Sequence, residues 1–138
     1  MKQVLVAMVF VSMVLTAAVS VRVIGSQIYD DRPLDKKVIS WDAGPDKIDV
    51  SKYTPEMKRK YKIFADRCGG KCHPLARAVN CDFVLEDDWE RYIKRMMRRA
   101  GRAMISPADA MEIYEFAVYD SKIRKKELYE YKLAASRQ

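Results

Sequence analysis

Residues 4–21 form a continuous apolar run that contains no charged residue and only three hydroxyl-bearing ones, with a cation on either side. Eighteen residues in a helix rise about 27 Å, close to the thickness of the hydrocarbon core of a membrane. The run therefore predicts a transmembrane anchor or a signal peptide over residues 1–24. Ala18 and Ser20 fit the small-residue pattern of a cleavage site, so both outcomes stay open. In either case we expect the following chain to be exported.

Residues 25–53 lack this apolar continuity and show little helical or strand-like periodicity. Glycine and proline interrupt the segment, which is otherwise rich in aspartate and lysine. Such a composition favours extended or turning backbone. We therefore predict an extended linker here, either a stalk or a wrap over the surface of the domain that follows.

Helical signals begin at residue 54. Thr54, Pro55 and Glu56 supply a capping hydroxyl, a proline suited to the first turn and an acid near the positive end of a helix. This helix is expected to run to about Arg67, because two consecutive glycines follow at positions 69 and 70.

Two more helices are predicted further along the chain. Between about Glu86 and Ala100, apolar residues recur at helical spacing on one face, and a glycine follows as a stop. Ser106 and Pro107 open the next helix with the same cap-and-proline pattern. Residues 121–133 are strongly charged, and we expect them to continue helically on the surface.

These elements predict an all-α fold. No stretch shows the alternation of a strand, so we expect residues 54–120 to form a small helical domain and residues 121–138 a charged helical tail. A domain of this size buries only a thin core by itself. A large apolar cofactor enclosed by the helices would supply much of the missing buried surface.

The main chemical signal is the sequence Cys-Gly-Gly-Lys-Cys-His at residues 68–73. A c-type haem needs two thiols, which form thioethers with its vinyl groups, and a histidine directly after the second cysteine to bind the iron. The usual motif has two residues between the cysteines, whereas this one has three. The two glycines give the loop the freedom to absorb the extra residue. Cys68, Cys72 and His73 are therefore candidates for holding one covalent haem.

Other interpretations of these residues stay open. Cys68, Cys72, His73 and Cys81 have the ligand types of a structural zinc site, although the adjacent Cys72 and His73 would struggle to reach one tetrahedral ion. A disulfide within the motif, or between the motif and Cys81, suits an exported protein. A thioredoxin-like redox pair is disfavoured, because it requires a two-residue spacing next to a strand.

The charge of the chain bears on its partners. A formal net charge of +7 permits docking to an acidic protein or an anionic membrane. No basic and aromatic interleaving indicates a base-stacking surface, so we expect no nucleic-acid partner. Six cations in residues 91–102 form either a solvated helix face or a docking surface for acidic redox partners. They are Arg91, Lys94, Arg95, Arg98, Arg99 and Arg102, with no acid among them.

The motif and the residues after it resemble a known family. Cys-Gly-Gly-Lys-Cys-His is followed by Trp89, Tyr92, Ile93 and Met96, and then by Ile-Ser-Pro-Ala-Asp-Ala at 105–110 and by Ile113 and Phe116. In this order they are similar to the small bacterial class I c-type cytochromes. The resemblance covers residues 54–120 and leaves the first 53 residues and the tail outside.

The resemblance implies a fold in which the first and last helices of the domain cross and pack against one haem. His73 would be the proximal axial ligand of the iron, and a methionine would be the distal ligand and raise the reduction potential. Met96 stands where similar domains carry that ligand. The other candidates are Met104 in the following loop, Met97 and Met111.

The expected function is therefore electron transfer by one covalent haem, with no enzymatic turnover, because histidine and methionine ligation leaves the iron no open position. We expect the protein in the bacterial inner membrane facing the periplasm, or free in the periplasm if the leader is removed. Its partners would be redox proteins or a larger respiratory or photosynthetic membrane complex. The alternative is a non-redox subunit of a membrane complex, in which the cysteine and histidine cluster forms a disulfide or binds zinc.

Overall fold

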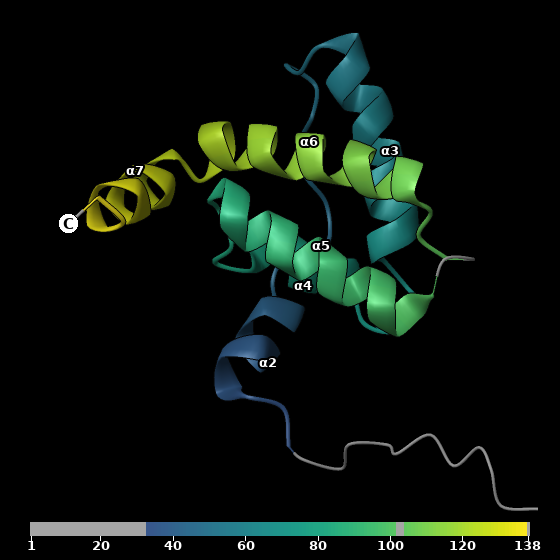
Figure 1. Cartoon of the computed structure of the whole chain (residues 1–138). Helices are drawn as coiled ribbons and strands as arrows, with labels where there is room; N and C mark the ends of the chain where they lie inside the picture. The colour runs from purple at the N-terminus through teal and green to yellow at the C-terminus, as the bar shows by residue number, and fades with distance from the viewer. Residues whose placement is uncertain (1–32, 102–103, 138) are drawn as a thin grey trace, which may run out of the picture. The chain divides into compact units, whose positions relative to one another are not determined.

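A computed structural model describes residues 33–101 and 104–137, and every regular element within these ranges is a helix. The helices are α2 (Lys36–Asp42), α3 (Pro55–Cys68), α4 (Leu75–Asn80), α5 (Glu86–Ala100), α6 (Pro107–Arg124) and α7 (Lys126–Ala135) (Figure 1). The all-α prediction is confirmed for this part of the chain. None of these helices has both the length and the apolar character needed to cross a membrane. The predicted leader at residues 1–24 lies outside the described residues.

Local signals place the ends of the long helices as predicted. α3 begins after Thr54, whose hydroxyl oxygen accepts a hydrogen bond from the backbone N–H of Met57 at 3.3 Å. α6 begins after Ser106, which forms a reciprocal capping box with Asp109. α5 stops before Gly101, whose φ of 78° lies in the left-handed region that glycine adopts without strain.

The prediction of an extended linker is wrong for residues 36–42, which form α2. Asp35 caps this helix by accepting a hydrogen bond at 2.7 Å from the backbone N–H two residues further on. α2 buries no residue of its own and packs against α4, another short helix that the sequence analysis did not predict. Helices this short are not stable alone, so contacts between them, rather than their own patterns, account for their formation. The rest of the described linker is not helical and buries Ile48 and Tyr53.

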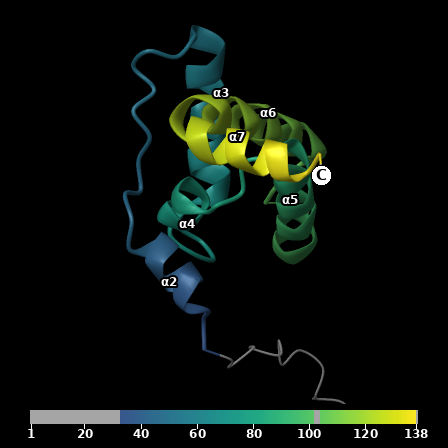
Figure 2. The same ribbon diagram turned by 90° about the vertical axis from the view of Figure 1, so that its left-hand side faces the viewer.

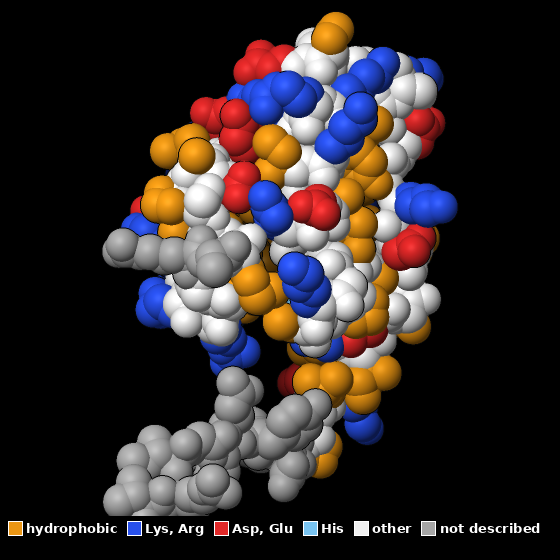
Figure 3. Space-filling model, turned by 90° about the vertical axis from the view of Figure 1, so that its right-hand side faces the viewer, with side chains coloured by type: hydrophobic (Ala, Val, Ile, Leu, Met, Phe, Trp, Pro, Cys, Tyr) orange, Lys and Arg blue, Asp and Glu red, His pale blue; other side chains and the backbone are white. Residues whose placement is uncertain are grey.

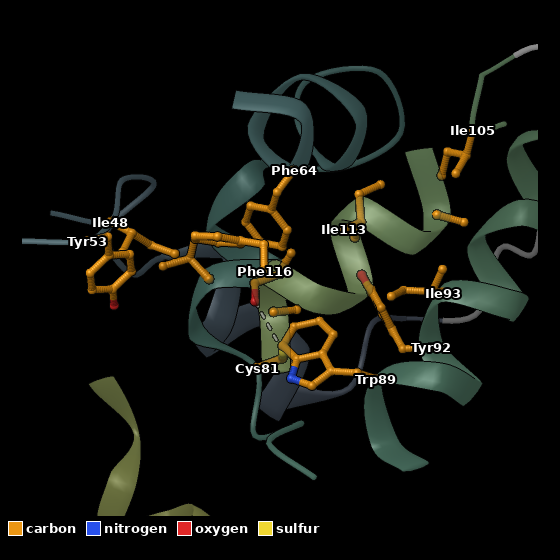
Figure 4. Packing of buried hydrophobic residues seen from close by; sticks show 14 residues of the cluster. Ile48, Tyr53, Phe64, Cys81, Trp89, Tyr92, Ile93, Ile105, Ile113 and Phe116 are labelled. Carbon is orange, nitrogen blue, oxygen red and sulfur yellow. Dashed lines mark hydrogen bonds between the residues drawn. The ribbon is translucent and has the colours of Figure 1, made fainter. Parts of the chain in front are cut away.

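The core lies where α6 packs against both α3 and α5 (Figures 1 and 2). The fully buried ring of Phe116 on α6 lies 5.1 Å, between centroids, from the ring of Phe64 on α3 (Figure 4). On the other side, the indole N–H of Trp89 donates a hydrogen bond to the Ser121 hydroxyl oxygen at 2.9 Å. These contacts join the first, middle and last long helices. α4 lies between α3 and α2, which brings the linker against the domain (Figure 2).

The charged tail is helical, as predicted, and its basic groups reach back to the domain. Arg124 donates to the backbone oxygen of Val79 at 2.8 Å, and Lys132 donates to that of Asp82 at 2.6 Å. These carbonyl groups lie at and just after the C-terminal end of α4, where the helix dipole favours positive charge. The tail therefore stabilises the loop between α4 and α5.

Candidate cofactor-binding site

The motif loop is shaped by its two glycines, each for a different reason. α3 ends at Cys68, and the loop then closes through a hydrogen bond from the backbone N–H of Gly70 to the backbone oxygen of His73 at 3.1 Å. Gly70 has a φ of 86°, which side chains other than hydrogen rarely allow. At Gly69 a Cβ atom would lie 2.8 Å from the backbone oxygen of Ala65. The three-residue spacer is thus folded into a tight turn.

This turn directs the motif residues to one place. Cys68, Cys72 and His73 line a single narrow cavity, which we call the motif cavity. Met96 from α5 and Met104 from the loop before α6 line it as well. The structure therefore brings together the two cysteines, the histidine and two of the candidate methionines, although they come from three separate parts of the chain.

A second, wider hollow adjoins the motif cavity. This α2 cleft has a volume of about 460 Å³, within the usual range for small-molecule sites. Cys72, His73 and Met96 line both hollows, so the two are neighbours around the same side chains. One wall of the α2 cleft is apolar and consists of Leu34, Val38 and Trp41.

The four candidate methionines separate into two groups. Met96 and Met104 line the motif cavity, and Met96 alone of these also lines the α2 cleft beside His73. Met97 and Met111 instead line a groove between α5 and α6 that contains no residue of the motif. The arrangement thus favours Met96 over Met97, as α5 turns the two side chains to different faces.

The histidine is oriented so that one ring nitrogen is available. Nδ1 of His73 lies 3.0 Å from the backbone oxygen of Pro74. A carbonyl oxygen only accepts hydrogen bonds, so this contact requires the proton to be on Nδ1. Nε2 of the neutral ring then carries the free lone pair that a metal ligand needs.

The three cysteines are free thiols in different surroundings. Burial raises the pKa of the Cys68 thiol to about 12, so this group is protonated at neutral pH. Cys72 is exposed, whereas Cys81 is buried and its sulfur donates to the backbone oxygen of Ala78 at 3.3 Å. Within the described ranges, no three His, Cys, Asp or Glu side chains are grouped so that they could hold a metal ion. The four-ligand zinc alternative has no geometric support there.

Sequence reasoning placed Tyr92 in the apolar stripe of its helix and missed its hydroxyl group. Only 6% of the side chain is exposed, and its oxygen is the one buried side-chain N or O atom of the described residues without a hydrogen-bond partner. Tyr92 lines both the motif cavity and the α2 cleft, and it points into the packed interior (Figure 4). Burial raises the pKa of this phenol, which therefore stays a neutral donor. A buried donor without an acceptor, beside candidate ligands, fits a site that takes a further group.

The predicted basic surface is only partly free. Arg91 is 2.9 Å from a carboxylate oxygen of Asp88, and Lys94 is 2.5 Å from one of Glu90. Arg102 lies outside the described residues. The other three, Arg95, Arg98 and Arg99, form no ion pair with any acid of the described residues. On the face drawn in Figure 3, basic side chains are interspersed with acidic and apolar ones rather than forming one continuous patch.

Comparisons with protein-family models, with curated proteins and with solved structures found no match to this chain. The described residues define an all-α chain in which two cysteines, one histidine and two methionines line a single cavity. This donor set is chemically suited to a covalent haem with histidine and methionine as axial ligands.

Proposed function

We propose that the chain binds one haem covalently and transfers electrons. The observation that supports this most directly is the lining of the motif cavity, where Cys68, Cys72, His73 and Met96 meet. Tyr92 lines the same cavity, and its buried hydroxyl has no hydrogen-bond partner among the described residues.

Each residue has a definite role in this proposal. The thiols of Cys68 and Cys72 would add across the two vinyl groups, with sulfur going to one carbon and hydrogen to the other, so that no oxidant is consumed. His73 would bind the iron through Nε2, and Met96 through its sulfur. The bound haem would supply one-electron exchange between ferrous and ferric iron. The apolar walls of the α2 cleft would restrict the access of water to it.

The proposal extends to location and partners. The apolar run at residues 4–21 would hold the protein in the bacterial inner membrane, facing the periplasm, or would direct its export if it is removed. The unpaired arginines of α5 would favour acidic redox proteins or an acidic face of a larger membrane complex.

The decisive experiment is an absorption spectrum combined with the intact mass of the full-length protein purified from its natural source. We expect a red protein that keeps its pigment in acidified acetone and whose mass exceeds that of the polypeptide by one haem. Cys72→Ser should weaken or abolish this acid-stable attachment, whereas Cys81→Ser should preserve it, because Cys81 lines neither hollow. A colourless protein of unmodified mass would contradict the proposal.

The choice of distal ligand has its own test. Met96→His should lower the reduction potential and change the visible spectrum, because a second imidazole replaces a thioether. Met97→His is the matched control, since that side chain lines a different groove. A methionine-ligated spectrum that survives in Met96→His would exclude Met96 and make Met104, the other methionine of the motif cavity, the next candidate to replace.

A further inference from the structure

The α2 cleft has an excess of positive charge that the electron-transfer proposal leaves unexplained. Three guanidinium groups line it, those of Arg77, Arg95 and Arg99, and no carboxylate of the described residues does. Arg77 is neutralised by Asp42, with two bonds of 2.8 and 2.5 Å between the guanidinium nitrogens and the carboxylate oxygens. Arg95 and Arg99 form no ion pair within the described part of the chain. The cleft thus has two guanidinium groups to offer to an anionic ligand.

The two arginines stand one helical turn apart on α5, on the same side of the helix. The guanidinium carbon of Arg95 lies 5.5 Å from the centre of the Tyr92 ring, and this contact orients the side chain. Like charges at this spacing repel each other, so an anion between them would be favoured over an empty position.

The other lining residues indicate what kind of anion fits. Leu34, Val38, Trp41 and Phe83 provide apolar and aromatic surface. A small hydrated anion such as phosphate gains nothing from such walls. A flat apolar ligand with carboxylates at one edge would use both the walls and the guanidinium groups, which bind carboxylates through paired N–H donors.

We propose that Arg95 and Arg99 bind the two carboxylates of the porphyrin and so determine which edge of it faces the α2 cleft. This inference rests on the proposed function, because Met96, between the two arginines in sequence, lines the same cleft together with His73. The inference also changes which arginines of α5 remain available for docking to acidic redox partners. Arg95 and Arg99 would be neutralised by the cofactor, and Arg98 would remain as the unpaired cation of the described part of α5.

The test is a titration of the full-length protein, prepared without haem attachment, with an iron porphyrin dicarboxylate and with its dimethyl ester. Wild type should bind the free acid more tightly than the ester. Arg95→Gln and Arg99→Gln should each lose roughly tenfold in affinity for the free acid, the usual effect of one charged hydrogen bond. Their affinity for the ester should not change, which also shows that the variants are folded.

Arg98→Gln is the matched control, because Arg98 is also exposed and unpaired among the described residues but does not line the α2 cleft. It should keep the preference of wild type for the free acid, and Arg95→Lys should recover part of the loss in Arg95→Gln. Equal affinity of wild type for acid and ester, or an equal loss in Arg98→Gln, would overturn the inference. These outcomes differ from failure of the proposed function, which would show as native protein without covalent haem.

Discussion

Replacement of Tyr92 by phenylalanine should stabilise the protein in the absence of its cofactor, although removal of a buried hydroxyl usually destabilises. The hydroxyl of Tyr92 is buried and has no hydrogen-bond partner within the described residues. An unsatisfied buried polar group costs about 1–3 kcal/mol, and Tyr92→Phe removes that cost while it keeps the ring in place. We therefore expect the free energy of unfolding to rise by about 1 kcal/mol or more.

Tyr53→Phe provides the matched control. The Tyr53 hydroxyl is also buried, but it donates to a carboxylate oxygen of Asp120 at 2.9 Å. Asp120 keeps its bonds to Arg124 in this variant, so only one hydrogen bond is lost. The free energy of unfolding should fall by about 1–2 kcal/mol. We thus expect the same chemical change to raise the free energy of unfolding at Tyr92 and to lower it at Tyr53.

The assay is urea unfolding of the full-length protein without haem, followed by far-ultraviolet circular dichroism. The slope of the unfolding free energy against urea concentration should be the same in wild type, Tyr92→Phe and Tyr53→Phe, so that the unfolding midpoints can be compared directly. If Tyr92→Phe loses stability by as much as Tyr53→Phe without haem, the hydroxyl has a partner and the reasoning fails.

Two other substitutions test contacts around the site. Asp42→Asn should cost about 1–2 kcal/mol at neutral pH, because it breaks the half-buried pair with Arg77 that holds α2. The Arg77 guanidinium holds the pKa of Asp42 below 3.8, so this contribution is present above that pH and disappears as the pH falls through the lowered pKa. Urea unfolding at neutral and acid pH should show that the difference in unfolding free energy between wild type and Asp42→Asn becomes smaller in acid. A difference that stays constant with pH would contradict the assignment of the effect to the ion pair. Trp89→Phe removes both the donor to Ser121 and part of a buried indole ring, so it should lower the unfolding free energy by about 2–4 kcal/mol in the same assay, and an unchanged midpoint would contradict this packing.

The sequence predicts the long helices well because their end signals are local. The capping hydroxyls of Thr54 and Ser106 and the stop at Gly101 act through neighbouring backbone groups, so one short stretch contains all the information. α2 and α4 do not form on local signals alone. α2 is held mainly by groups on and near α4, including the Arg77 pair and the Asn80 side chain, which donates to the backbone oxygen of Trp41 at 3.1 Å. Tertiary contacts of this kind leave no periodic signal in the sequence.

The residues of the candidate site also fall into those that the sequence predicts and those that it does not. Cys68, Cys72 and His73 are predictable because the motif is contiguous, and Met96 follows from its place on the apolar stripe of its helix. The special position of Tyr92 is not predictable, because it depends on which acceptors are missing around its hydroxyl in three dimensions. The same holds for the unpaired arginines, since a run of cations in sequence does not reveal which of them have acidic partners.

The domain that would bind the cofactor therefore begins earlier than the resemblance suggests. Residues 54–120 contain every proposed ligand, yet one wall of the α2 cleft comes from Leu34, Val38 and Trp41. Residues Leu34–Gln138 form one compact unit, which agrees with a boundary near residue 34 rather than 54. A site open on that side would admit water beside His73, and the environment of a haem iron governs its reduction potential. Leu34, Val38 and Trp41, which precede the region of the resemblance, thus belong to the proposed redox site.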